Sequence, residues 1–393
     1  MSDIYEKSLL AHAQWKGKIS INIKVDLKDK ADLALAYTPG VAQPCLAIKA
    51  DPESVYQYTW KGNSVAVITD GTAVLGLGDI GPKASLPVME GKCALFKAFA
   101  GIDAVPIALD TKDPEEIIKI CQALAPSFGG FNLEDIAAPR CVQIERALKK
   151  TLDIPVFHDD QHGTAIVVAA GLINALKLVH KEFKEIKVVV SGAGAAGSSI
   201  MFMLRNLGVK SILGFSKEGI LRKSNRSSYD FLAQELSEFT NPDDLDLTLA
   251  QALVGADVFI GVSAPRLVTS AMVSTMAKDP IVFALANPEP EITVEEAKQG
   301  GARIIATGRS DFPNQVNNVL VFPGLFRGAL DAKATQITET MKIEAAKALA
   351  SLITDQELSA AYIIPSVFDP RVADTVAAQV SRVAIETGMI RKG

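Results

Sequence analysis

The sequence predicts an α/β fold with two domains, and three observations carry this prediction. The chain has 393 residues, of which 48% are hydrophobic, and domains usually hold about 100 to 200 residues. From Phe183 onward, short apolar runs alternate with helical stretches, which is typical of a parallel sheet covered on both faces. Before Asp160 the alternation is different. We therefore expect one domain over residues 1–161 and a second over 162–393, with the boundary near Asp160 to Gly163.

Composition and charge exclude several classes of protein. Forty basic residues against 45 acidic ones give a net charge of −5, so there is no overall attraction for a nucleic acid. The longest uncharged run, Val188 to Leu204, has 17 residues and is too short to span a membrane. The first residues carry charges and lack the apolar core of a secretory signal. We expect a cytoplasmic protein with neither a nucleic acid nor a membrane as partner.

Four cysteines are widely spaced and form no C-x-x-C pair: Cys45, Cys93, Cys121 and Cys141. This spacing argues against a disulfide framework and against a thiolate zinc site. We expect buried, unreactive thiols.

The first domain is predicted to begin its sheet with a hairpin. Two short apolar runs flank the turn Asp70-Gly71, which is a hairpin signal. Asp113 followed by Pro114 indicates a helix start, because aspartate caps the first turn and proline fits its first position. The elements expected in order are strands over 65–69 and 73–77, a helix near 84–100, a strand over 103–109 and a helix from 114 to about 123.

The second domain is predicted to be a parallel sheet followed by packing helices. Five short apolar runs, KVVVS, SILGF, ADVFIGV, PIVFALA and ARIIATG, are separated by helical stretches. The end of the chain carries two apolar stripes at helical spacing. These are Ile337, Met341, Ala345, Leu349 and Leu352, and then Val372, Val376, Val380 and Val383 after the start signal Asp369-Pro370.

The strongest local signal is the segment KVVVSGAGAAGSSIMFML, in which an apolar strand leads through three glycines into a helix. Gly192 permits a tight turn, Gly194 lets the backbone approach a pyrophosphate, and Gly197 lets the helix pack on the strand. The free N–H groups at the helix start then face the phosphates. The segment predicts a dinucleotide site at Gly192, Ala193, Gly194, Ala195, Ala196 and Gly197. The alternative is a glycine-rich turn that binds no ligand.

The identity of the dinucleotide stays open. An NAD site usually has an acid at the end of its second strand, about 20 residues past the glycines, to bind the ribose 2′-hydroxyl. Here Ser216 and Lys217 stand at that place. They do not repel the 2′-phosphate of NADP, although the nearby cations are equally consistent with a solvated loop. A second copy of the glycine pattern, Gly76, Gly78 and Gly81, is interpreted as a turn that shapes one wall of an active site.

Four carboxylates follow apolar runs that would end at the edge of a sheet. Glu134 and Asp135 lie in FNLEDIAAPR, and Asp159 and Asp160 lie in PVFHDDQHGTA. Their oxygen atoms suit Mg²⁺ or Mn²⁺, although adjacent acids on a loop are often only solvated or cap a helix. The two histidines that flank the second pair are interpreted as hydrogen-bond partners.

Lys92 and Tyr37 each have two interpretations. Lys92 lies in LPVMEGKCALFKAFAG, with apolar neighbours one helical turn away on each side. A lysine pressed toward a core has its pKa lowered by desolvation, as a general base requires, whereas most helical lysines extend to solvent. Tyr37, before the turn in LALAYTPG, is either a cleft residue or a structural tyrosine.

Eight segments stand in a specific order along the chain. They are AYTPGVAQPC, VAVITDGTAVLGLGDIGP, MEGKCALFKAFAGIDAVPI, FNLEDIAAPRC, FHDDQHGTA, VVVSGAGAAG, FALANP and PNQVNNVLVFPGL. Together they resemble the malic enzyme family, and the resemblance covers most of the chain. In length the chain resembles the small bacterial type. This implies an N-terminal α/β catalytic (malic) domain, a C-terminal Rossmann-type domain with added helices, and a homodimer.

The resemblance implies roles for individual residues. Lys92 matches the general base, Tyr37 the general acid, and Asp159 a carboxylate that supports the lysine. The ligands of Mg²⁺ or Mn²⁺ would be Glu134, Asp135 and Asp160. Positions near the substrate and the nicotinamide would be Asn287 and Asn317 or Asn318.

The implied reaction is the metal-dependent oxidative decarboxylation of (S)-malate to pyruvate and CO₂, with reduction of NAD or NADP. Lys92 would take the hydroxyl proton as hydride leaves C2. The metal would withdraw charge from the ketone oxygen as CO₂ leaves, and Tyr37 would protonate C3. Larger relatives carry an arginine where this sequence has Ala73, so the residues that clamp the substrate carboxylates are not identified.

Other functions are compatible with the same scaffold. An oxaloacetate decarboxylase would use the metal and the lysine without net redox chemistry, and the complete glycine segment argues against it. A malate-to-lactate converting enzyme with tightly held NAD resembles longer chains more. A catalytically inactive binding module is disfavoured, because the lysine, the tyrosine and the metal acids are all present.

Overall fold

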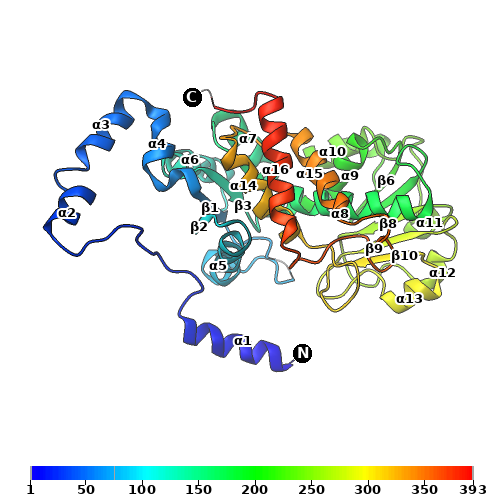
Figure 1. Cartoon of the computed structure of the whole chain (residues 1–393). Coiled ribbons are helices and arrows are strands. Elements are labelled where there is room, and N and C mark those ends of the chain that lie inside the picture. The colour runs from blue at the N-terminus through cyan, green and yellow to red at the C-terminus, as the bar shows by residue number, and fades with distance from the viewer. Residues whose placement is uncertain (1, 75, 392–393) are drawn as a thin grey trace.

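The computed structural model describes residues 2–74 and 76–391 and contains two sheets with helices on their faces (Figure 1). The smaller sheet belongs to the first half of the chain and the larger one to the second half. One long helix, α8 (Asp159–Val179), begins directly after the last strand of the smaller sheet and packs beside the larger one. The predicted α/β class is confirmed.

The smaller sheet has four parallel strands in the order β2-β1-β3-β4. They are β1 (Ser64–Thr69), β2 (Asp103–Ala108), β3 (Gly130–Leu133) and β4 (Val156–His158), with the helices α5 (Gly81–Ala100), α6 (Pro114–Leu124) and α7 (Arg140–Thr151). Alternate side chains of β1 enter different cores. Val65 and Val67 belong to the core that includes α5, whereas Ala66 and Ile68 pack with α6 and α7.

The predicted hairpin across Asp70-Gly71 is wrong. β1 pairs with β2 on one side and β3 on the other, so neither edge is free for a strand over 73–77. That segment is a tight loop closed by a bridge between Val74 and Gly78, and Leu75 lies outside the described residues. Gly71 and Gly78 turn the chain there with φ of 68° and 72°. The other elements predicted for this half are present.

The larger sheet has the order β10-β9-β8-β5-β6-β7, and every predicted strand is present. The strands are β5 (Lys187–Ser191), β6 (Ser211–Ser216), β7 (Gly219–Ile220), β8 (Val258–Gly261), β9 (Ile281–Ala284) and β10 (Ile304–Thr307). All pairs are parallel except that of β6 with β7. The strand order reverses at β5, and open sheets of this kind bind ligands at the carboxyl ends beside such a reversal.

The helices of the second half join the two sheets. The C-terminal helices α14 (Phe322–Asp331), α15 (Glu339–Ser351) and α16 (Arg371–Glu386) bury the two predicted stripes and share one core with α5 and α8. The remaining helices here are α9 (Ala195–Asn206), α10 (Phe231–Ser237), α11 (Leu249–Leu253), α12 (Ser270–Val273) and α13 (Val294–Gln299), with 3₁₀ turns η4 (Lys223–Ser228) and η5 (Asn318–Leu320).

Helix α8 is long and apolar enough to cross a membrane by composition alone. However, 72% of its most apolar window is buried inside the protein. Core helices of folded domains pass the same test of length and composition, so the helix is interpreted as part of the core.

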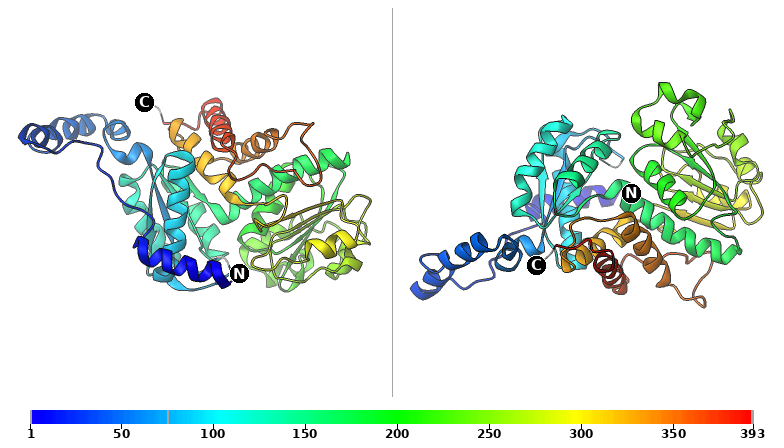
Figure 2. Two further views of the ribbon diagram at one scale, coloured as in Figure 1. Left: turned by 60° about the horizontal axis from the view of Figure 1, so that its bottom comes forward. Right: turned by 90° about the horizontal axis from the view of Figure 1, so that it is seen from above.

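Residues 2–50 form an arm that extends from the body of the protein (Figures 1 and 2). Its helices are α1 (Ser2–Trp15), α2 (Lys30–Ala36) and α3 (Ala42–Ala50). After the arm, the chain forms η1 (Pro52–Ser54), α4 (Val55–Tyr58) and η2 (Trp60–Asn63) before β1. A further short turn, η3 (Ala125–Ser127), follows α6 in the body of the protein. Cys45 on this arm is exposed, so the prediction of buried thiols holds only for the other three cysteines. The arm exposes large apolar side chains, among them Ile4, Leu9, Leu10, Trp15, Ile21, Ile23, Leu33, Leu35 and Leu46.

Candidate functional site

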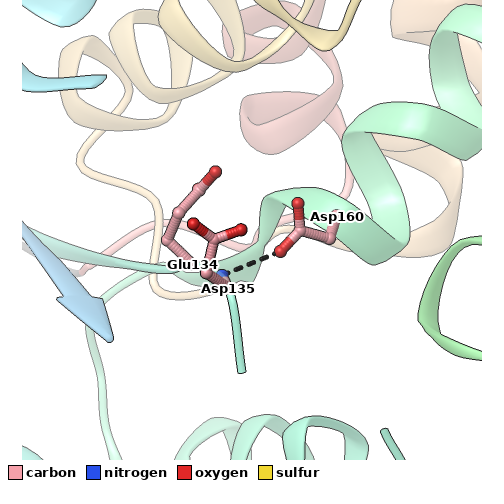
Figure 3. Close-up of side chains that lie close together, drawn as sticks. All are labelled: Glu134, Asp135 and Asp160. Carbon is pink, nitrogen blue, oxygen red and sulfur yellow. Dashed lines mark hydrogen bonds between the residues drawn. The ribbon is translucent and has the colours of Figure 1, made fainter. Parts of the chain in front are cut away.

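The four predicted carboxylates lie at the carboxyl ends of two neighbouring strands. Glu134 and Asp135 follow β3, and Asp159 and Asp160 follow β4 as the first residues of α8. Because β3 and β4 are parallel and adjacent, the residues after them meet at one edge of the sheet. Ligand oxygens of Glu134, Asp135 and Asp160 all lie within 4.8 Å of one another (Figure 3).

Hydrogen bonds shape this cluster but leave some oxygens free. The N–H of Asp135 donates to Asp160 Oδ2 at 2.9 Å, and Asn132 Nδ2 donates to Glu134 Oε2 at 2.8 Å. Asp135 Oδ2 and Asp159 Oδ1 are buried without a hydrogen-bond partner in the described part of the chain. Buried polar atoms without partners are costly unless a ligand satisfies them. Asn132 is absent from the sequence-based set, although its place two residues before Glu134 puts both on one side of β3.

Burial raises the pKa of all four carboxyl groups. The pKa of Asp135 rises to about 9 and that of Asp159 to about 8, with repulsion from neighbouring carboxylates as a further cause. A divalent cation would offset this crowding of negative charge, and oxygen ligands are those that Mg²⁺ and Mn²⁺ prefer. The donor set therefore fits a divalent metal.

Lys92 extends from α5 into the same cluster and is only 8% exposed. Its Nζ lies 2.5 Å from Asp159 Oδ2, 2.8 Å from Glu134 Oε1 and 4.1 Å from the ring centre of Phe322. Burial lowers the pKa of Lys92, but the charges of Asp159 and Glu134 outweigh burial and raise it. The expectation of a lowered pKa is therefore wrong for this arrangement of charges, because both carboxylates reach the lysine from other elements.

Asn318 reaches the cluster from the second half of the chain. Its Nδ2 donates to Asp159 Oδ2 at 2.5 Å. Gly163 leaves room for this contact, since a Cβ there would lie 2.0 Å from Asp159 Oδ1. The side chain of Asn317 instead accepts the N–H of Val319 and caps η5. The structure thus brings Asn318 to the lysine cluster, whereas the side chain of Asn317 is engaged in its own turn.

The second glycine loop and Asn287 lie on the same side of the molecule. Asn287 follows β9, and its Nδ2 donates to Leu285 O at 3.3 Å. The N–H of Ala73 donates to Asp135 O at 2.9 Å, and a Cβ on Gly76 would lie 3.8 Å from Pro288 Cδ. The loop therefore connects the carboxylate cluster with the segment after β9, which agrees with its interpretation as a wall of the site.

The first glycine segment has the geometry of a dinucleotide turn. β5 ends at Ser191, Gly192 turns with φ of 113°, and α9 begins at Ala195. A Cβ on Gly197 would lie 1.8 Å from Gly192 O, so helix and strand approach as closely as glycine alone allows. Gly194, Ala195 and the residues after them lie at the start of α9, next to the reversal of strand order. The turn therefore fits a pyrophosphate at a helix N-terminus.

Ser216 ends β6, and with Lys217 it lines a cavity of about 410 Å³. Ser216 Oγ accepts the N–H of Glu218 at 3.1 Å. Arg222, which also lines the cavity, pairs with Asp246 at 3.1 Å. No carboxylate stands at the last residue of β6, so that residue does not repel the 2′-phosphate of NADP.

Tyr37 is not brought to Lys92 within one chain. It caps the end of α2 and is 66% exposed, and Figures 1 and 2 show α2 and α3 apart from α5. The arm touches α5 at Lys18, whose N–H donates to Glu90 Oε2 at 2.9 Å, whereas no residue of α2 or α3 is buried.

A buried polar network adjoins the carboxylate cluster. Burial lowers the pKa of His162 to about 4, so its ring is neutral at pH 7. Its Nε2 lies 2.8 Å from Glu145 Oε2 and its Nδ1 lies 3.0 Å from Lys342 Nζ, so Nε2–H donates and Nδ1 accepts. Glu145 also accepts the N–H of His158 at 3.2 Å. Glu145 and Lys342 are missing from the sequence-based set because only the fold brings them to the histidine.

Two family descriptions match this sequence. Residues 16–149 match "Malic enzyme, N-terminal domain", and residues 161–385 match "Malic enzyme, NAD binding domain". These two segments make up most of the chain.

Individual proteins match over nearly the whole chain. A bifunctional malic/malolactic enzyme of Bacillus subtilis (strain 168) is 56% identical over 98% of this chain and 94% of that protein. An NAD-dependent malic enzyme of Geobacillus stearothermophilus is 55% identical over 99% of this chain and 81% of that protein. The crystal structure of malic enzyme from Pyrococcus horikoshii Ot3 superposes with a TM-score of 0.94 at 47% identity, covering 99% of this chain and 92% of the other.

Proposed function

The chain belongs to the malic enzyme family, and on this premise we propose that it oxidises (S)-malate and decarboxylates the product to pyruvate and CO₂. NAD or NADP accepts the hydride. The observation that carries the proposal is the contact of Lys92 with Asp159 inside the carboxylate cluster, where Asn318 also arrives. A lysine, carboxylates that suit a divalent cation and an amide from the second half of the chain thus lie at one place.

In this proposal Lys92 takes the hydroxyl proton of malate as hydride leaves C2. Asp159 and Asn318 orient the lysine, and Glu134, Asp135 and Asp160 would hold Mg²⁺ or Mn²⁺. When bound, the metal supplies Lewis-acid polarisation of the substrate oxygens, and its charge offsets the carboxylates that raise the pKa of Lys92.

The dinucleotide would lie across the carboxyl edge of the larger sheet. The turn from Gly192 to Gly197 would receive the pyrophosphate, and the cavity at Ser216 and Lys217 would receive the adenosine ribose. Asn287 would lie toward the nicotinamide and the substrate, with Asn317 or Asn318 near it.

The proposal is tested by absorbance at the reduced-nicotinamide band after addition of malate and Mn²⁺, with NAD and NADP in separate reactions. We expect malate-dependent reduction with a matching amount of pyruvate. The dinucleotide that is reduced faster shows whether Ser216 and Lys217, at the end of β6, favour NAD or NADP. Absence of reduction with both dinucleotides would overturn the proposal.

The contact of Lys92 with Glu134 and Asp159 also suits one second candidate, an oxaloacetate decarboxylase. That reaction needs the lysine and the metal ligands but no hydride acceptor. Pyruvate from added oxaloacetate, without any malate-dependent reduction of NAD or NADP, is the result that this candidate predicts.

We also propose that the protein is a homodimer in which the arm of each subunit packs on the other. The exposed apolar side chains of the arm support this, because soluble proteins rarely leave so many together in water. Tyr37 is carried on the same arm, so as general acid it would serve the site of the partner subunit.

A mixed dimer tests this arrangement. Lys92→Ala and Tyr37→Phe are each expected to be inactive alone, since each lacks one proton-transfer group. When both are co-expressed, half of the dimers are mixed and each has one complete site, so about a quarter of the wild-type activity should return. Malate oxidation by the purified mixture measures this. Tyr58→Phe, which changes another exposed tyrosine, should stay active. A mixture without activity would contradict the shared site.

A cytoplasmic location and the division into domains 1–161 and 162–393 complete the proposal. The division falls in the first turn of α8. It is supported by the two family matches, of which one ends at residue 149 and the other begins at residue 161.

A further inference from the structure

Glu291 is a fully buried carboxylate that has only backbone partners nearby. It is 0% exposed and lies in the segment NPEPE after β9. Its Oε1 accepts the N–H of Ser263 at 2.8 Å, and its Oε2 accepts the N–H of Ala286 at 3.1 Å. Within residues 2–74 and 76–391 no cation lies in ion-pair distance of it. Burial raises the pKa of Glu291, whereas the N–H groups of Ser263 and Ala286 act against this rise. A buried carboxyl group held only by N–H groups fixes the backbone that carries them.

The two N–H groups belong to the loops that follow β8 and β9. Ser263 lies two residues after β8, and Ala286 lies two residues after β9. Gly261 lets the carboxyl group lie directly beside β8, since a Cβ there would be 2.3 Å from Glu291 Cδ. Glu291 therefore sets the positions of two neighbouring loops at the carboxyl edge of the sheet.

The loop after β8 also touches the dinucleotide turn. Ser263 Oγ lies 2.9 Å from the Oγ of Ser191, the last residue of β5. A Cβ on Gly192 would lie 2.8 Å from Val262 O. In a sheet of this order the adenosine half lies on the β6 side of the reversal and the nicotinamide half on the β8 side. The loops after β8 and β9 therefore border the nicotinamide half.

We propose that Glu291 is a positioning residue that holds the loops 262–265 and 285–287 in the form that binds the nicotinamide half of the dinucleotide. This inference rests on the proposed function and deepens it. Glu291 contacts no reacting atom and acts through Ser263 and Ala286. Replacement by glutamine puts an NH₂ donor against one of the two N–H donors, so one loop loses its partner. Dinucleotide binding should weaken roughly tenfold, as expected for a lost charge-assisted hydrogen bond.

The test compares Glu291→Gln with Glu289→Gln in the full-length protein. Glu289 lies two residues earlier, is exposed, and pairs with Arg266 at the surface. Three quantities are measured: the Kd for reduced dinucleotide by its fluorescence, the KM for dinucleotide in malate oxidation, and the decarboxylation of added oxaloacetate without dinucleotide. We expect Kd and KM to rise in Glu291→Gln, with oxaloacetate decarboxylation unchanged, and no change in Glu289→Gln.

Other outcomes overturn the inference in distinguishable ways. If Glu291→Gln binds dinucleotide as tightly as the wild type, Glu291 has no positioning role. If Glu291→Gln loses oxaloacetate decarboxylation to the same extent as dinucleotide binding, the substitution damages the protein generally, and the inference is overturned as well. A wild-type protein that binds no dinucleotide contradicts the proposed oxidation itself. If Glu291→Gln does not fold, Glu291→Asp replaces it, because the shorter carboxylate keeps the charge but reaches only one loop. Unaltered dinucleotide binding by Glu291→Asp then overturns the inference.

Discussion

Replacement of Lys92 by alanine is expected to abolish malate oxidation, with a loss in kcat of at least about 10²- to 10⁴-fold. The substitution removes the only cation of the described residues that pairs with Asp159 and Glu134. Reduction of NAD and of NADP, followed by absorbance with malate and Mn²⁺, measures the loss. Lys97→Ala is the matched control, since Lys97 lies on the same helix, is 62% exposed and pairs with Asp103 at the surface. It should keep wild-type activity.

The Lys92→Ala variant should still fold. Without the ammonium group, the buried carboxyl groups can bind protons instead, because burial already raises the pKa of Asp159 to about 8 and that of Asp135 to about 9. Circular dichroism and the melting temperature check the fold. A folded Lys92→Ala variant with full activity would remove Lys92 from the role of base. A loss in Lys97→Ala would show that damage to α5 alone lowers the activity.

The strands of the second half could be predicted from local pattern, whereas the pairing of β1 could not. A short, continuous apolar run between helical segments has one common place in a fold, a parallel strand covered on both faces, and each such run became a strand. The segment around Asp70-Gly71 carried an equally clear hairpin signal. It failed because β2 and β3, which lie further along the chain, occupy both edges of β1.

For the site, too, the sequence indicated the types of residue involved but not all of the contacts between them. The segments that contain Lys92 and the carboxylates indicated which side chains matter, and the apolar runs before the acids indicated that each pair would follow a strand. The direction of the pKa shift of Lys92 depends on two side chains from other elements, which no helical pattern reveals. Tyr37 shows a further limit of prediction from sequence. Its motif identifies the residue, but it does not indicate that the arm carrying Tyr37 extends away from the rest of the protein.

Asparagine in place of Asp160 is expected to raise the Mn²⁺ concentration needed for half-maximal activity by at least about 100-fold. Loss of a residue that only supports a metal ligand costs about 10- to 100-fold in metal affinity, so loss of a charged ligand should cost more. The loop should keep its shape, because asparagine can still accept the N–H of Asp135 through its Oδ1. Malate oxidation titrated with Mn²⁺ measures the effect. An unchanged titration would remove Asp160 from the ligand set.

The same substitution should make the chelator-treated protein more stable at alkaline pH. Burial and repulsion raise the folded-state pKa of Asp135 to about 9 and that of Asp159 to about 8, against about 4 when unfolded. The folded state therefore binds more protons, and stability falls as pH rises from about 4 through these folded values. Asp160 is one of the charges that raise the pKa of Asp135, so its removal should make the fall smaller.

Thermal unfolding at pH 6 and pH 9 in the presence of a chelator measures this difference. Between the two pH values, Asp160→Asn should lose less in melting temperature than the wild type. Added Mn²⁺ should raise the melting temperature of the wild type more, because only the wild type keeps the full ligand set. Asp355→Asn is the control, since Asp355 is 85% exposed and pairs with Lys177 at the surface, so its curve should follow the wild type. Equal losses of melting temperature in Asp160→Asn and the wild type would contradict this explanation. The explanation requires that repulsion among these carboxylates, the same charges that favour the metal, destabilises the folded protein when no metal is bound.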